Sequence, residues 1–137
     1  MIRALAFPLL LASRVALASE PPIPSSILVQ TTKAWSGQSY DSYPKGTPQL
    51  TVRKVVLQPG AQFPWHTHPM PAAGYVVSGS LEVESKDGKH RVRLGPGEVL
   101  AEMQGIVHRG RSGDTVTELV VFYAGAEGVP LSVDHPD

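Results

Sequence analysis

The sequence predicts an all-β fold of one domain, either a sandwich or a small barrel. The chain has 137 residues, a length typical of a single domain. Glycine and proline number 13 each, and both interrupt helices, so a bundle of long helices is disfavoured. At least eight short stretches with a strand pattern follow one another at nearly regular spacing, and no stretch has a convincing helical pattern.

The charge balance and the absence of cysteine exclude several kinds of function. Twelve basic residues balance twelve acidic residues, so no basic excess favours nucleic acid, and we expect no nucleic-acid partner. Without cysteine the chain has no disulfide, zinc–thiolate site, iron–sulfur cluster or thiol nucleophile. No glycine-rich phosphate loop lies between a predicted strand and a helix, so no nucleotide cofactor is indicated.

Residues 1–18 have the pattern of a secretory signal peptide. Arg3 supplies a positive start, residues 4–12 are largely apolar, and Ala16-Leu17-Ala18 is a small-x-small end. The segment is too short for a permanent membrane anchor. We therefore expect cleavage before Ser19 and export to the periplasm or the exterior, without a stable membrane anchor. A buried N-terminal helix is the alternative interpretation.

Four segments are predicted along the chain. They are a signal peptide (1–18), an N-terminal extended segment with a first strand (19–48), the barrel core (49–125) and a C-terminal tail (126–137). Three prolines make residues 20–26 an extended linker, and the run Ile-Leu-Val-Gln-Thr-Thr at 27–32 predicts the first strand. Residues 35–48 are rich in glycine, serine, tyrosine and proline and predict an irregular crossing segment.

The barrel core contains the other predicted strands. These are residues 50–57, 63–68, 74–78, 80–85, 90–94, 98–103, 106–111 and 115–124. A hairpin turn at 86–89 joins two strictly alternating stretches. Alternation places Leu81, Val83, Val92 and Leu94 on one face, which we predict to be the core. The tail is polar, and we expect His135 within it to be disordered.

Two of the five histidines form the pair His66-Thr67-His68. Residues i and i+2 of a strand project to the same face, so both imidazoles can approach one ion. A third ligand must come from elsewhere in the fold. An isolated pair of this kind is more often two partly exposed histidines, so the pair by itself is weak evidence. His90 lies in a polar hairpin strand and is not expected to contribute.

The spacing around these histidines resembles the two motifs of the cupin superfamily. Gly60, His66, His68 and Gly79 match the glycines and histidines of G-x5-H-x-H-x3-E-x6-G. The second motif, G-x5-P-x-G-x2-H-x3-N, matches at Gly97, Gly105 and His108. The resemblance covers residues 50–124 and implies a small single-domain cupin barrel of the jelly-roll type. It also implies that His66, His68 and His108 bind one metal ion.

Three positions depart from the cupin motifs. Ala72 stands where the first motif has its glutamate, and Met103 and Ser112 stand where the second has its proline and asparagine. A site of three histidines can still form, and it resembles that of some cupin oxygenases, such as the cysteine dioxygenases, which also lack that glutamate. The other outcome is a cupin that has lost its metal. Imidazole ligands suit several divalent transition metals, so Fe, Ni, Cu, Zn and Mn are not distinguished.

Glu102 is the candidate catalytic residue, because it lies on the strand that leads to His108. Alternation puts Leu100 and Glu102 on one face of this strand and Val99 and Ala101 on the other. If the Leu100 face is inward, Glu102 could replace the missing ligand or act as an acid or base. If the Val99 face is inward, Glu102 is a solvated surface charge.

Two functions of different classes are consistent with these features. The first is a metal-dependent cupin enzyme acting on a small organic molecule, with a dioxygenase-like oxidoreductase reaction. The second is a non-catalytic exported cupin module that binds a metal or a small ligand. The edge strands of small cupins resemble dimer interfaces, so we also expect a homodimer.

Overall fold

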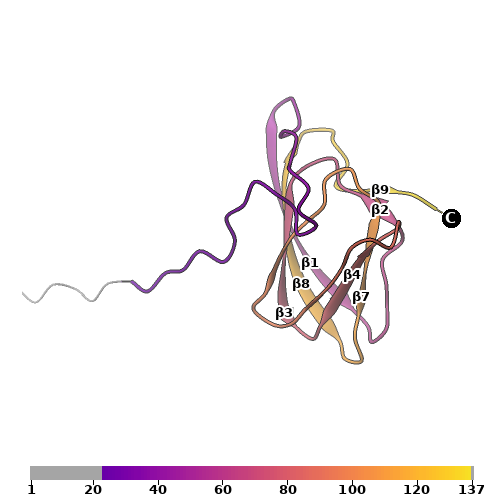
Figure 1. Ribbon diagram of the computed structural model, residues 1–137. Helices are drawn as coiled ribbons and strands as arrows, with labels where there is room; N and C mark the ends of the chain where they lie inside the picture. Colours follow the sequence, from indigo (N-terminus) through magenta and orange to yellow (C-terminus); the bar gives the residue numbers. More distant parts are fainter. Residues whose placement is uncertain (1–22, 137) are drawn as a thin grey trace, which may run out of the picture.

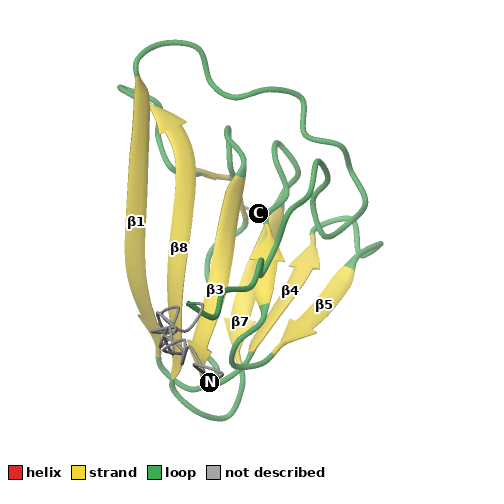
Figure 2. Ribbon diagram, turned by 90° about the vertical axis from the view of Figure 1, so that its left-hand side faces the viewer, coloured by secondary structure: helices red, strands yellow, loops and turns green. Residues whose placement is uncertain are grey.

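The computed structural model describes residues 23–136, which fold into two facing antiparallel sheets (Figures 1 and 2). The predicted signal peptide, residues 1–18, lies outside the described residues and stays a prediction. Residues 23–136 contain no helix, and therefore none that could cross a membrane.

The first sheet has four strands in the order β1-β8-β3-β6. They are β1 (Pro48–Leu57), β8 (Thr117–Ala126), β3 (Ala72–Ser78) and β6 (Val99–Ala101). The two longest strands, β1 and β8, pair along their whole length, from Pro48 opposite Ala126 to Leu57 opposite Thr117. This long pairing fixes which residues of β1 face the interior.

The second sheet has five strands in the order β5-β4-β7-β2-β9. They are β5 (Arg91–Leu94), β4 (Leu81–Ser85), β7 (His108–Ser112), β2 (His66–Thr67) and β9 (Val133–Asp134). The two histidine-bearing segments lie side by side in this sheet, because His66 pairs with His108 across β2 and β7.

The core lies between the two sheets and is built from alternating side chains. Leu81, Val83 and Leu94 are buried and Val92 packs against them, which confirms the predicted core face of the hairpin. Alternating residues of β3 and β8, Val76 and Leu119 among them, face these side chains from the other sheet. The fold is therefore an all-β jelly-roll sandwich, as the sequence predicts.

The strand predicted at residues 27–32 is wrong. This segment pairs with no other strand, and in Figure 1 it leads away from the sheets toward the N-terminus. Ile27 and Leu28 are exposed by 76% and 64%. A run with strand propensity forms a stable strand only where a partner and a buried face exist, and neither lies beside it.

The C-terminal segment returns to the barrel and is more ordered than the sequence suggests. Strand β9 pairs with β2, with His66 opposite Asp134. The expected disorder of His135 is wrong, because its backbone N–H donates to the Trp65 carbonyl at 2.7 Å and its Nε2 lies 3.1 Å from the Thr67 hydroxyl. A two-residue strand shows no periodicity, so the sequence cannot reveal this pairing.

Gly79, the last glycine of the first motif, cannot accommodate a side chain. Its φ is +78°, and an added Cβ would lie 2.5 Å from Val116 O and from Thr117 Oγ1. Gly88 has a similar φ of +71°, but an added Cβ would meet nothing within 4 Å. A side chain at Gly88 would therefore meet backbone strain alone, whereas a side chain at Gly79 would meet both strain and steric overlap.

We expect Gly79→Ala to lower the free energy of unfolding by about 2–5 kcal/mol, since strain and overlap add. Gly88→Ala, the matched control, should cost only about 1–2 kcal/mol. Urea denaturation of both variants measures the difference. Equal losses would show that the contacts of Gly79 do not constrain the fold.

Candidate metal centre

The structure brings the three predicted histidines together inside the barrel. His66 lies on β2, His68 follows it, and His108 begins β7. Each offers one ring nitrogen, and these three atoms lie within 4.8 Å of one another. His68 and His108 are buried, and His66 is half-buried. The i, i+2 spacing therefore does place the first two imidazoles on one side of the chain, facing the third.

Backbone carbonyls orient all three imidazoles in the same way. In each ring Nδ1 is the nitrogen within hydrogen-bond distance of a carbonyl oxygen. The acceptors are Pro64, Leu131 and Ile106, at 2.8, 2.7 and 2.7 Å from His66, His68 and His108 respectively. A carbonyl can only accept, so Nδ1 carries the proton, and in the neutral ring Nε2 keeps its lone pair. Metal-binding histidines are oriented in this manner.

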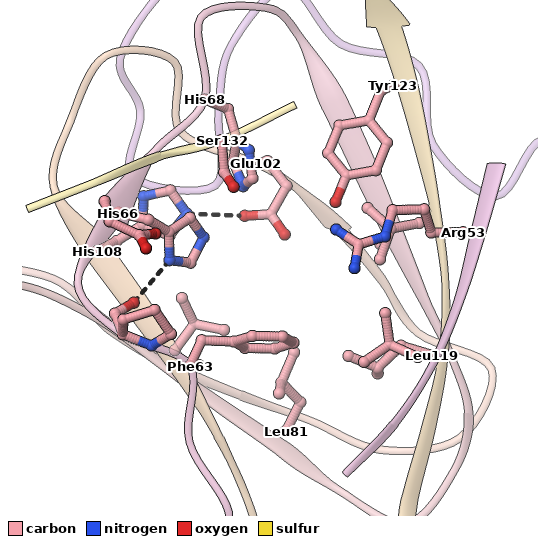
Figure 3. A pocket seen from close by; sticks show the side chains of 17 residues that line it. Arg53, Phe63, His66, His68, Leu81, Glu102, His108, Leu119, Tyr123 and Ser132 are labelled. Atoms are coloured by element: carbon pink, nitrogen blue, oxygen red, sulfur yellow. Dashed lines mark hydrogen bonds and ion pairs between the residues drawn. The ribbon is translucent and has the colours of Figure 1, made fainter. Parts of the chain in front are cut away.

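Glu102 lies on the inner face of the barrel, beside His108 (Figure 3). Its Oε2 is 3.3 Å from His108 Nε2, and its side chain is only 12% exposed. Leu100 is also buried, so the Leu100 face of this segment is the inward one. Gly74 leaves room for the carboxylate, because a Cβ at Gly74 would lie 3.6 Å from Glu102 Oε1. The catalytic role of Glu102 stays a prediction.

Glu102 lies directly opposite Ala72 in the first sheet. Ala72 is the position at which the first cupin motif has its glutamate. Ala73 pairs with Ala101, and the Glu102 N–H donates to the Ala72 carbonyl at 2.9 Å. Directly opposite residues of antiparallel strands project to the same face. The acidic group that the first motif lacks at Ala72 is therefore present directly opposite, at the residue that follows β6.

The electrostatics of the cluster favour one positive charge between Glu102 and the imidazoles. Burial lowers the pKa of His66 and of His68, so both rings stay neutral. Burial acts in the same direction on His108, but the close contact with Glu102 and its negative charge outweigh it and raise the pKa of His108. Burial would raise the pKa of Glu102, yet the three histidines hold it below its ordinary value.

Two polar atoms in this cluster lack a conventional hydrogen bond. Glu102 Oε2 and His108 Nε2 are both buried, and apart from their mutual contact neither has a partner. Buried polar atoms normally have hydrogen-bond partners, so two neighbouring buried atoms without one indicate a site for a ligand. A divalent cation fits this donor set, because three imidazole nitrogens lie within 4.8 Å of one another and a carboxylate oxygen lies beside one of them.

The other polar residues near the second motif have structural partners. Arg109 donates to Glu84 Oε1 from Nε at 2.9 Å and from Nη2 at 2.7 Å, and its guanidinium lies 4.1 Å from the centre of the Trp65 ring. His90 packs edge-on against Trp35, with 6.0 Å between ring centres. These side chains do not join the histidine cluster.

The histidine cluster opens into a cavity of about 140 Å³ between the two sheets. Apolar side chains form most of its walls, and Arg53 and Tyr123 line it as well. Sequence reasoning missed Arg53 and Tyr123. The sequence does contain a pattern that could have identified them. Arg53 shares a strand face with Val55 and Leu57, and Tyr123 shares one with Leu119 and Val121. A cation and a hydroxyl on inward positions of alternating strands indicate a site.

Comparisons with known proteins agree with this architecture. The cupin domain family model matches residues 53–123, more than half of the chain. Among solved structures, a cupin-like protein from Thermotoga maritima is 22% identical, with a TM-score of 0.55, over 64% of this chain and 65% of that one. The DMSP lyase DddQ from Ruegeria pomeroyi DSS-3 is 25% identical, with a TM-score of 0.54, over 71% of this chain and 46% of that one.

An oxalate oxidase in complex with glycolate is 24% identical, with a TM-score of 0.51, over 60% of this chain and 45% of that one. The chain thus spans less than two thirds of the length of each of these proteins. No curated protein matches the sequence significantly. The match over both motifs, the jelly-roll sandwich and the buried cluster of three histidines show that the chain belongs to the cupin family.

Proposed function

We propose that the protein is a metal-dependent cupin enzyme that acts on a small organic molecule, with a dioxygenase-like oxidoreductase reaction. The observation that carries this proposal is the convergence of three oriented imidazoles and one buried carboxylate at the wall of a cavity. A structural metal site is normally closed by its ligands, whereas a catalytic site keeps a side open to substrate. The cavity supplies that open side.

His66, His68 and His108 would hold the ion through Nε2. A divalent transition metal bound there would supply Lewis-acid chemistry and, for a redox-active metal, electron transfer with dioxygen. The backbone carbonyls that accept from Nδ1 keep the three rings in position. Glu102 offsets the charge of the ion and can hold a proton at Oε2, and the apolar walls limit the access of water.

The position of Glu102 favours an enzyme over a non-catalytic binding module. Besides offsetting the charge of an ion, Glu102 lines the cavity, where a reaction that moves protons needs a carboxylate within reach. The similarity to a DMSP lyase at 25% identity is also in keeping with catalysis on a small molecule. The non-catalytic module remains the second candidate.

An oxygen-electrode screen of the metal-loaded protein against small polar organic molecules tests the proposal. We expect dioxygen consumption that requires both the metal and one class of substrate. Glu102→Gln should reduce this turnover by about 10²–10⁴-fold if Glu102 moves the proton. A metal-loaded protein that binds a ligand without consuming dioxygen or converting the ligand would instead be the binding module.

A further inference from the structure

The cavity has a second polar end, formed by Arg53 and Tyr123. Arg53 lies on β1 opposite Val121 of β8, and Tyr123 lies opposite Thr51. Both side chains point into the cavity, where they face the histidine cluster across the open space (Figure 3). Tyr123 also contacts His68, with 5.6 Å between ring centres. The two ends of the cavity are thus linked by one side chain.

The guanidinium of Arg53 has no ion-pair partner among residues 23–136. Arg91 and Arg109, by contrast, are both paired with Glu84. The carboxylates that line the same cavity belong to Glu102 and Asp134, and the first of these is engaged with His108. Arg53 therefore presents a free cation to whatever enters the cavity.

Arg53 also remains accessible to solvent, which places it at the mouth of the cavity. The Tyr123 hydroxyl lies beside Arg53 in the cavity and can donate a hydrogen bond. A planar guanidinium beside a hydroxyl donor is well suited to a carboxylate, which accepts two parallel N–H donors.

The walls between the two ends define the middle of the ligand. They include Phe63, Leu81, Leu119 and Val121, all apolar. The cavity volume of about 140 Å³ lies below the range of about 300–1,000 Å³ that is typical of pockets for drug-sized ligands, so a small ligand is favoured.

We propose that Arg53, with the Tyr123 hydroxyl beside it, binds the carboxylate of a small organic acid whose other end lies at the histidine cluster. This inference rests on the proposed function and names its class of substrate. With a bound dication, the cavity charges of the ion and Arg53 exceed those of Glu102 and Asp134, so an anion is favoured over a neutral or cationic ligand.

Isothermal titration calorimetry of the metal-loaded protein with succinate tests the inference, with succinamide as the neutral counterpart. We expect the wild type to bind succinate and to prefer it over succinamide. Arg53→Gln should weaken succinate binding by about ten- to hundredfold, the loss expected for a charge-assisted contact. The succinate affinity of Arg53→Lys should fall between those of the wild type and Arg53→Gln, because lysine keeps the positive charge but does not offer the two parallel N–H donors of a guanidinium.

The matched control is Lys54→Gln, on the same strand but the opposite face, where Lys54 pairs with Glu118 at 2.9 Å. It removes the same charge and should leave succinate affinity unchanged. Equal affinity of the wild type and Arg53→Gln, or no preference for succinate over succinamide, would overturn the inference.

Metal content, measured in the same samples, separates this inference from the proposed function. Arg53→Gln should retain as much metal as the wild type. A wild-type protein that holds no metal, yet binds succinate through Arg53, would overturn the proposed function and leave the anion site standing.

Discussion

Replacing His108 with alanine should lower the affinity for a divalent metal by at least about a hundredfold. Removing partners of a metal ligand already costs 10–100-fold, so removing a ligand should cost at least the upper end of that range. His108 is buried at the start of β7, and its Nε2, the predicted ligand atom, contacts Glu102. Its loss therefore removes one donor and leaves the carboxylate without its partner.

Metal content after dialysis, together with competition against a chelator, measures this effect. His90→Ala is the matched control, because His90 is a half-buried histidine outside the cluster. It should retain full metal content. Circular dichroism establishes whether His108→Ala keeps its sheet structure. If the folded variant holds metal as tightly as the wild type, His108 is not a ligand.

Replacing Glu102 with glutamine should weaken metal binding by about ten- to hundredfold while the fold remains intact. The substitution keeps the size of the side chain and removes its negative charge. A dication held by three neutral imidazoles in a buried site needs a nearby anion to offset its charge. Glu102 Oε2, 3.3 Å from His108 Nε2, is placed to supply it.

Glu98→Gln provides the control for Glu102→Gln. Glu98 precedes strand β6, is exposed, and accepts a hydrogen bond from the Gly95 N–H at 2.6 Å. Its neutralisation should not change metal affinity. Equal effects of the two substitutions in a chelator competition would mean that Glu102 contributes only to the overall charge. An unchanged affinity in both would show that the centre needs no carboxylate.

The sequence predicted the strands that alternate clearly and missed those that depend on distant partners. The hairpin at 80–94 has two alternating stretches, so its core face could be assigned correctly. Residues 27–32 have strand propensity without a neighbouring edge, and β9 is a strand only because β2 passes beside it. Pairing of this kind is decided by tertiary contacts that one stretch of sequence does not contain.

Some residues of the candidate site could likewise be predicted from the sequence, and others could not. The motif spacing brought His66, His68 and His108 into consideration, and the structure does bring them together. Alternation showed that Leu100 and Glu102 share a face but could not say which face is inward, since a strand has two equivalent sides until it packs. Arg53 was missed for a related reason, because it shares a face with Val55 and Leu57 but alternation alone does not show that this face is inward.

X-ray absorption spectroscopy of the metal-loaded protein would show directly whether three imidazoles hold one divalent ion beside a carboxylate. We expect about one ion per chain, with an imidazole scattering pattern and metal–ligand distances of about 2.0–2.2 Å. The pattern should weaken in His108→Ala. An ion coordinated by oxygen atoms alone, or a folded protein that binds no divalent ion, would show that the three histidines do not form a metal centre.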